Sequence, residues 1–192
     1  MSFLNWEDTL RFNPHDPLNA FATHGIPVPT YGNYGGAGYT AGEFGSKTPE
    51  PSELTAETQP VDQLDALFYQ HDLVHQHFSD GTAAFSDIVA ADVSLILGMS
   101  ALKYTDPGDV NYDPAAGLYE GLAVVGTVLK LQTELKAVGS DITQLPIYNG
   151  IVAATQEAFV NFEAGLESAP REARSLHSLL PLFEHHFADF LT

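Results

Sequence analysis

Two apolar stripes at helical spacing constrain this chain more than any other feature of its sequence. In the first, between residues 61 and 78, apolar side chains recur at steps of three and four, and His71 lies among them. This recurrence predicts an amphipathic helix with the histidine on its apolar face. Asp62, preceded closely by Pro60, is the expected N-cap. Asp72 lies about 100° further around the helix, at the margin of the stripe.

The second stripe, between residues 83 and 103, contains one acid, Asp92, in an otherwise apolar row. A tight Ser-Asp-Gly-Thr turn separates the two stripes, so the helices are expected to be antiparallel neighbours. At 1.5 Å per residue, His71 and Asp92 then lie at the same height to within roughly 3 Å. An isolated buried carboxylate is costly, so we predict that Asp92 pairs with His71. The other interpretation is that Asp92 bonds a tyrosine or water.

The rest of the chain divides at a proline- and glycine-containing break between residues 103 and 114. Beyond it, apolar periodicity predicts three more helices, at about 115–138, 146–167 and 171–191. Residues 1–30 are rich in aromatic residues and prolines. We expect them to wrap the core, with a turn or two of helix between Leu4 and Leu10. No strand pattern is evident, so the predicted fold class is all-α.

We expect one domain, residues 1–192, in three parts. Residues 1–30 form the wrapping segment, residues 31–104 hold the helix pair with the loop before it, and residues 111–192 form an additional helical part. The last part has no evident role in the sequence beyond binding a partner, covering a site or mediating oligomerisation.

Charge and composition exclude several classes of function. The formal net charge of −18 argues against binding of nucleic acid and against docking on anionic lipid. Without cysteine the chain has no disulfide, zinc–thiolate site or thiol nucleophile. It also lacks an apolar run of membrane-spanning length and an N-terminal signal peptide. We therefore expect a cytoplasmic protein, a mature form without its leader or one exported by another route, with peripheral membrane contact at most.

A glycine-rich loop precedes the first helix. Residues 31–45 contain six glycines, which permit backbone geometries that can turn several carbonyl or N–H groups toward one point. The loop is not a phosphate-binding Walker loop, since no Gly-Lys-Ser/Thr follows, and no buried strand for a dinucleotide site precedes it. The loop can also be a flexible linker.

Together these features resemble the calcium-dependent phospholipases A2 of the secreted type. The family has a tyrosine- and glycine-containing calcium loop, then Pro-x-Asp-x-Leu-Asp, then His-Asp on the same helix. Here the loop is Tyr-Gly-Asn-Tyr-Gly-Gly-Ala-Gly at residues 31–38, and the helix runs from Pro60 through Asp65 to His71 and Asp72. The match covers residues 31–100 and looks like the short, cysteine-free members.

The resemblance implies a calcium-dependent hydrolase that cleaves the sn-2 ester of a phospholipid substrate. It implies that His71 is the general base for water and that Asp92 orients it. The backbone N–H of Gly36 would join calcium in stabilising the oxyanion. The implied Ca²⁺ ligands are the carboxylate of Asp72 and three backbone carbonyls, those of Tyr34, Gly36 and Gly38. Because of the net charge, zwitterionic or dispersed substrates are expected.

The sequence departs from the family in several respects, and two other functions are open. The disulfides are absent, so the loop must be held by packing, and His75 stands where the family has a tyrosine. One other function is a transition-metal site formed by His71, His75 and His77, with Asp72 as a further ligand. The second is a non-catalytic, acidic binding or structural module with a phospholipase-like fold.

Overall fold

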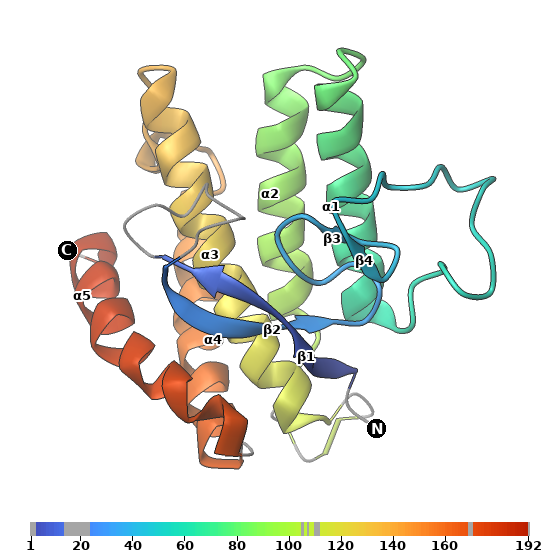
Figure 1. Ribbon diagram of the computed structural model, residues 1–192. Coiled ribbons are helices and arrows are strands. Elements are labelled where there is room, and N and C mark those ends of the chain that lie inside the picture. Colours follow the sequence, from blue (N-terminus) through green and yellow to red (C-terminus); the bar gives the residue numbers. More distant parts are fainter. Residues whose placement is uncertain are drawn as a thin grey trace.

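The computed structural model describes residues 3–13, 24–104, 106, 108–109, 112–168 and 171–191. The described part of the chain is mostly helical and carries two small sheets (Figure 1). Its helices are α1 (Gln63–Ser79), α2 (Phe85–Ser100), α3 (Pro114–Ala137), α4 (Tyr148–Ser168) and α5 (Leu180–Leu191), with short 3₁₀ helices η1 (Ile142–Gln144) and η2 (Arg171–Leu179). Residues 14–23 of the expected wrapping segment, and 105, 107, 110 and 111 of the expected break, lie outside the described residues.

The helix pair predicted from the two apolar stripes is present. α1 and α2 lie side by side and antiparallel, joined by the short turn between them (Figure 1). Asp62 is the N-cap of α1, and its side chain accepts a hydrogen bond from the backbone N–H of Asp65. The pair therefore begins and ends within a few residues of the positions that its sequence predicts.

α3 and α4 pack closely against each other, and a glycine permits it. A β-carbon on Gly121 of α3 would lie 2.6 Å from the carbonyl oxygen of Ala158 and 2.7 Å from Phe162 Cβ, both on α4. Only a residue without a side chain allows the two backbones to approach this closely. The additional helical part is thus a tightly packed pair, to which η2 and α5 are added.

Two predictions are wrong. The chain does contain strands, and the segment between Leu4 and Leu10 is part of one rather than a turn or two of helix. β1 (Leu4–Phe12) pairs with β2 (Ile26–Tyr31) in an antiparallel sheet, and β3 (Tyr39–Thr40) pairs with β4 (Glu43–Phe44). Two sequence features hide the larger sheet. An irregularity between Asn5 and Thr9 shifts the register and breaks the period-two alternation of β1. In β2, Pro27 and Pro29 remove two donors, both from the same edge.

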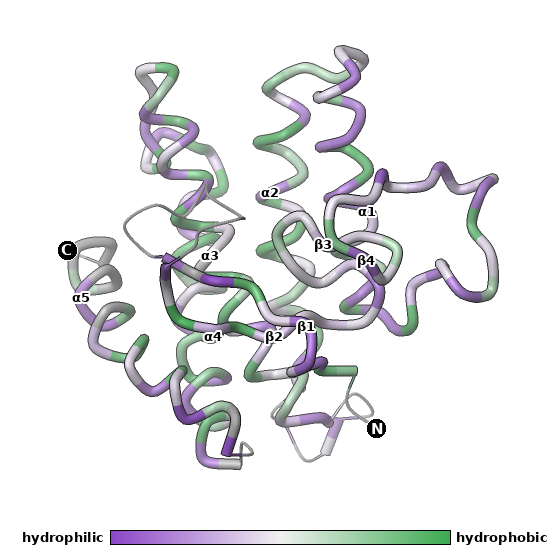
Figure 2. Tube along the Cα trace, in the orientation of Figure 1, coloured by the Kyte–Doolittle hydropathy of each residue, from purple (hydrophilic) through white to green (hydrophobic). Residues whose placement is uncertain are grey.

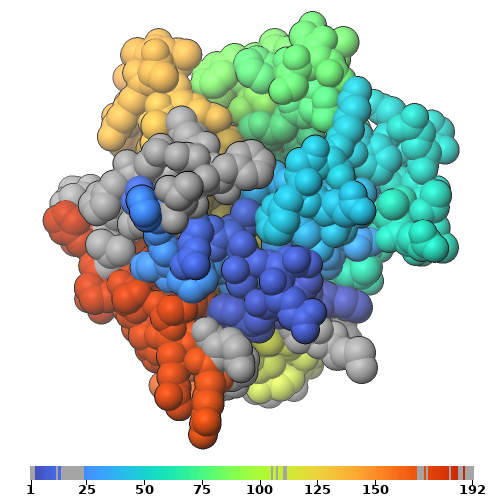
Figure 3. Space-filling view, in the orientation of Figure 1, coloured from blue at the N-terminus to red at the C-terminus, as the bar shows by residue number. Residues whose placement is uncertain are grey.

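This larger sheet occupies the place expected of a wrapping segment. β1 contacts α3, and β2 contacts η2. In the space-filling view, β1 and β2 (blue) lie across the face shown, between the loop segment (cyan) and the C-terminal helices (orange-red) (Figure 3). The long connection before α1 instead projects away from the helices and is mostly hydrophilic (Figures 1 and 2).

Two apolar clusters form the core, and α3 belongs to both. The first includes Ile96 of α2 and Val124 of α3. The second includes Val125 of α3, Phe162 of α4 and Phe183 of α5. α4 also contributes to both clusters, so α3 and α4 together connect the site-bearing helix pair with the C-terminal helices in one interior. Across the described residues, no helix has both the length and the apolar character needed to cross a membrane.

Candidate functional site

A cleft of about 170 Å³ lies between the glycine-rich loop, the helix pair and α3. Most of its walls are apolar and come from five elements: Leu10, Val28, Phe68, Leu95, Tyr119, Leu122 and Ala123. The polar side chains at the cleft are those of Tyr34, His71, Asp72, Thr127 and Lys130, and Gly36 also lines it. Four of the residues singled out from the sequence, at positions 34, 36, 71 and 72, thus line one cavity.

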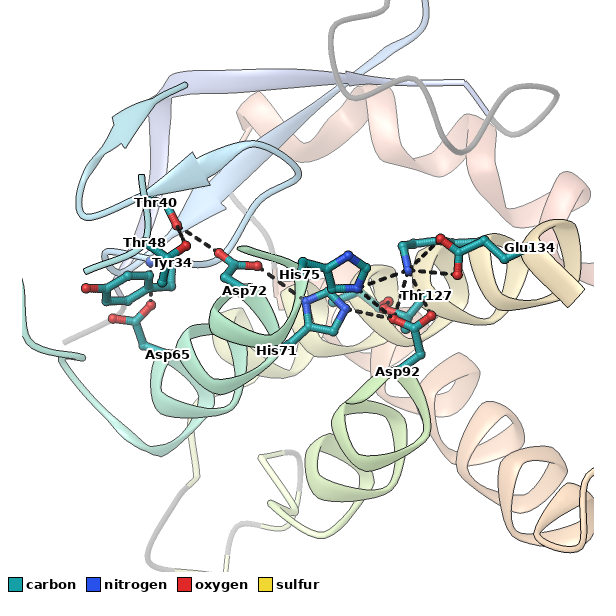
Figure 4. Close-up of polar contacts among 12 residues, drawn as sticks. Tyr34, Thr40, Thr48, Asp65, His71, Asp72, His75, Asp92, Thr127 and Glu134 are labelled. Carbon is teal, nitrogen blue, oxygen red and sulfur yellow. Dashed lines mark hydrogen bonds and ion pairs between the residues drawn. The ribbon is translucent and has the colours of Figure 1, made fainter. Parts of the chain in front are cut away.

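His71 and Asp92 face each other across the helix pair, as their heights on the two helices predict. Nε2 of His71 lies 2.8 Å from Oδ1 of Asp92 (Figure 4). The side chain of Asp92 is fully buried, whereas that of His71 keeps 15% of its surface exposed. A carboxylate can only accept, so Nε2 carries the proton of this bond. That assignment leaves Nδ1 as the nitrogen that can take up a second proton.

The other side of His71 faces Asp72. Nδ1 of His71 lies 3.3 Å from Oδ1 of Asp72, so the imidazole stands between two carboxylates (Figure 4). Burial lowers the pKa of His71, but the hydrogen bonds and charges of Asp72 and Asp92 outweigh burial, and the pKa is raised. The ring therefore has both the position and the proton affinity of a general base.

Asp92 has a second partner that the sequence did not indicate. The ammonium of Lys130, on α3, donates to both carboxylate oxygens of Asp92, at 2.9 and 2.8 Å. It also lies 3.1 Å from the carboxylate of Glu134 and 3.3 Å from Nε2 of His75. Burial alone would raise the pKa of Asp92, but hydrogen bonds with His71 and His75 and the charge of Lys130 lower it far below its usual value. The buried carboxylate is thus ionised.

The glycine-rich loop is attached to the start of α1 by side chains, in place of disulfides. The buried carboxylate of Asp65 accepts hydrogen bonds from the backbone N–H groups of Asn33 and Tyr34, at 2.9 and 2.8 Å. The hydroxyl of Tyr31 donates to Asp62, the N-cap of α1. These bonds fix the loop beside the helix that carries His71, which answers how a loop without disulfides is held.

Three of the four expected calcium ligands lie at the cleft, and the fourth does not. Tyr34, Gly36 and Asp72 line the cleft, and Oδ2 of Asp72 accepts a hydrogen bond of 3.0 Å from Thr40 in the same loop. Gly38 is not among the lining residues, and its carbonyl accepts from the N–H of Gly45. A carbonyl retains a second lone pair after such a bond. The carbonyl of Gly36 likewise accepts a hydrogen bond, from the N–H of Tyr39. Carboxylate and carbonyl oxygens are the donors that calcium prefers, so the donor types of the residues at the cleft suit this ion.

The transition-metal alternative finds only part of its expected ligands together. Ligand atoms of His71, His75 and Asp92 lie within 4.8 Å of one another. His77 is not with them, because its Nε2 bonds a glutamate on the connection before α1 at 2.8 Å. The ammonium of Lys130 also lies against His75 and Asp92, so a metal would have to displace this charge.

Two functional contacts were therefore missed by sequence reasoning. The attachment of the loop by Asp65 is not predicted from the motif Pro60–Asp65, although the spacing of Asp65 from Asp62 indicates a capping interaction. Lys130 gave no signal, because it lies 38 residues after Asp92, on a helix whose apolar faces dominated the interpretation.

Comparison of the chain with protein-family models, with curated proteins and with solved structures finds no match. The function of the chain is therefore inferred from its own residues and their geometry.

Proposed function

We propose that the chain is a calcium-dependent hydrolase of the phospholipase A2 type, which cleaves the sn-2 ester of glycerophospholipids. One observation carries the proposal. An apolar cleft ends at an imidazole whose far nitrogen is bound to a buried, ionised aspartate, while the loop and carboxylate that suit a hard cation line the same cleft. A base, an apolar chain site and a cation site at one place are what hydrolysis of a lipid ester needs.

The proton path follows from the two nitrogens of His71. A water oxygen bonds to the ester carbonyl carbon as one of its protons passes to Nδ1 of His71. Asp92, bonded to Nε2, stabilises the imidazolium that forms. When the intermediate collapses, the bond from the carbonyl carbon to the glycerol oxygen breaks and the proton passes to that oxygen. The products are a fatty acid and a lysophospholipid.

The loop and Asp72 would hold the cation. Calcium bound by oxygens of Tyr34, Gly36 and Asp72 would supply a Lewis acid that stabilises the oxyanion of the ester. Thr40 donates to one oxygen of Asp72, which orients this carboxylate toward the loop. Apolar side chains of α1, α2 and α3 would take the hydrocarbon part of the substrate and keep bulk water from it.

The test is release of fatty acid from dispersed phosphatidylcholine, with calcium and with a chelator. We expect release by the wild type in calcium alone. His71→Gln should lower the rate by at least about 100-fold without loss of the fold, because the base is removed. His77→Gln is the matched control, since it makes the same change on the same helix away from the cleft. Absence of release by the folded wild type in calcium, or full activity of His71→Gln, would contradict the proposal.

The alternative from the other class is a non-catalytic module with the same architecture. It predicts calcium binding without any release of fatty acid. The wild type and His71→Gln should then be equal in both calcium binding and fatty-acid release. The transition-metal alternative is favoured by the grouping of His71, His75 and Asp92, and it predicts tight binding of cobalt or zinc by the wild type. Metal analysis and the chelator experiment separate these alternatives.

A further inference from the structure

The ammonium of Lys130 is bound to both oxygens of the carboxylate that holds His71. It comes from α3, which lies outside the segment that resembles a phospholipase. Its side chain is 22% exposed and lines the cleft, whereas its partner Asp92 is completely buried. This ammonium is therefore at the edge of the site rather than deep in the core.

A buried ion pair of this kind is not expected to stabilise the fold by itself. Burying two charges costs about as much as their attraction returns, and well-packed apolar residues often stabilise a protein more. What the pair does supply is geometry, because a carboxylate that accepts from an ammonium at both oxygens cannot rotate freely. The oxygen Oδ1 of Asp92 is then kept toward Nε2 of His71, 2.8 Å away.

We propose that Lys130 is a positioning residue for the hydrolysis, which fixes the carboxylate of Asp92 against Nε2 of His71. The inference depends on the proposed function for its kinetic part, but the contact between Lys130, Asp92 and His71 can be tested without substrate. It also gives the additional helical part a role: α3 completes the site with a charge and forms one wall of the cleft.

Three substitutions at one position test this proposal. Lys130→Met removes the charge and keeps the length of the side chain. Lys130→Gln also removes the charge but keeps a donor for Asp92, so it decides the question if the methionine variant does not fold. Lys130→Arg restores a cation that can bond both oxygens of Asp92. Lys136→Met, on an exposed position of the same helix, is the control for loss of one positive charge.

The kinetic measurement is kcat and KM on a dispersed phosphatidylcholine with calcium, for variants whose folding is checked by circular dichroism. We expect Lys130→Met and Lys130→Gln to lower kcat by roughly 10- to 100-fold with a smaller change in KM, since the proposed role of Lys130 acts through Asp92 on the base. Lys130→Arg should recover most of the rate, and Lys136→Met should equal the wild type. Wild-type kcat in folded Lys130→Met or Lys130→Gln would overturn the proposal.

The second measurement is the proton resonance of His71 Nε2–H in ¹⁵N-labelled protein, identified by its loss in His71→Gln. We expect this resonance to shift or broaden in the methionine and glutamine variants and to stay in place in Lys130→Arg and Lys136→Met. An unchanged resonance in either uncharged variant would overturn the positioning role, whether or not the wild type hydrolyses a lipid. If the variants show the expected resonance changes but the wild type releases no fatty acid, the result counts against the proposed function alone.

Discussion

The carboxylate of Asp65 fills the space that a side chain on Gly32 would need. A β-carbon built on Gly32 would lie 2.4 Å from Cγ of Asp65, and the glycine has a positive φ of 55°. Asp65 at the same time accepts the backbone N–H groups of Asn33 and Tyr34. The absence of a side chain at position 32 is therefore what allows the acid on α1 to hold the glycine-rich loop.

Gly32→Ala should detach this loop from α1. We expect a loss of about 2 to 4 kcal/mol in the free energy of unfolding, from backbone strain and from displaced hydrogen bonds of Asp65. Gly45→Ala is the control, because Gly45 has a positive φ of 75° but no atom within 4 Å of its would-be side chain. It should lose only the strain, about 1 to 2 kcal/mol. If urea unfolding gives equal losses of unfolding free energy for Gly32→Ala and Gly45→Ala, the contact with Asp65 does not contribute to the loss.

A buried acid on α3 makes stability depend on pH. Glu120 is fully buried, and burial raises its pKa to about 8, although a hydrogen bond from Asn161 partly opposes this. Because the pKa in the folded state lies above the ordinary value of 4.5, the folded protein binds this proton more tightly than the unfolded chain does. Stability should therefore fall as the pH rises between about 4.5 and 8.

Glu120→Gln should remove that dependence. We expect the wild type to lose on the order of 3 to 5 kcal/mol in the free energy of unfolding from this residue between pH 5 and 9, while the amide variant loses much less. Urea unfolding at several pH values measures the slope. Glu163→Gln, at an exposed position of α4, should behave like the wild type. The interpretation fails if Glu120→Gln keeps the wild-type slope.

Calcium should stabilise the folded protein through Asp72. At a calcium concentration about a hundred times the dissociation constant, the gain is about 2.7 kcal/mol, which a thermal unfolding experiment detects as a rise in Tm. Asp72→Asn should abolish the rise because it removes the charged ligand. Glu57→Gln, which removes one charge from the exposed connection before α1, should keep it. A rise of equal size in Asp72→Asn would place the ion elsewhere.

Filling the cleft should block the reaction without altering the base. Ala123 of α3 lines the cleft, so the ring of Ala123→Phe would occupy the proposed chain site. We expect release of fatty acid from long-chain phosphatidylcholine to fall at least about tenfold, while the fold by circular dichroism is kept. Ala153→Phe, on an exposed position of α4, should retain activity. Undiminished release by Ala123→Phe would mean that the substrate binds at another place.

The helix pair could be predicted because its determinants are local. The apolar spacing that defines each helix also gives the height of each residue along it, and a short turn fixes the direction of the second helix. His71 and Asp92 were thus paired from arithmetic on neighbouring segments, and they lie 2.8 Å apart. The phospholipase assignment itself stays a prediction.

The remaining parts depend on contacts that no local pattern encodes. Lys130 reaches Asp92 across the break before α3, and its partner could not be inferred from the spacing on its own helix. The pairing of β1 with β2 is hidden by the register shift after Asn5, and the prolines of β2 lower its apparent strand propensity. In both cases tertiary contacts decide what the sequence leaves open.

The membership of α3 in both apolar clusters makes this site difficult to transplant. A fragment of residues 31–104 would carry the imidazole and its two neighbouring acids into a new scaffold, but without the counter-charge and without the walls of the cleft that β1, β2 and α3 supply. Asp92 would then be an unbalanced anion in a half-open interior, which any recipient protein would have to neutralise. A transplant of the proposed site would therefore have to include α3 and the β1–β2 sheet together with the loop, α1 and α2.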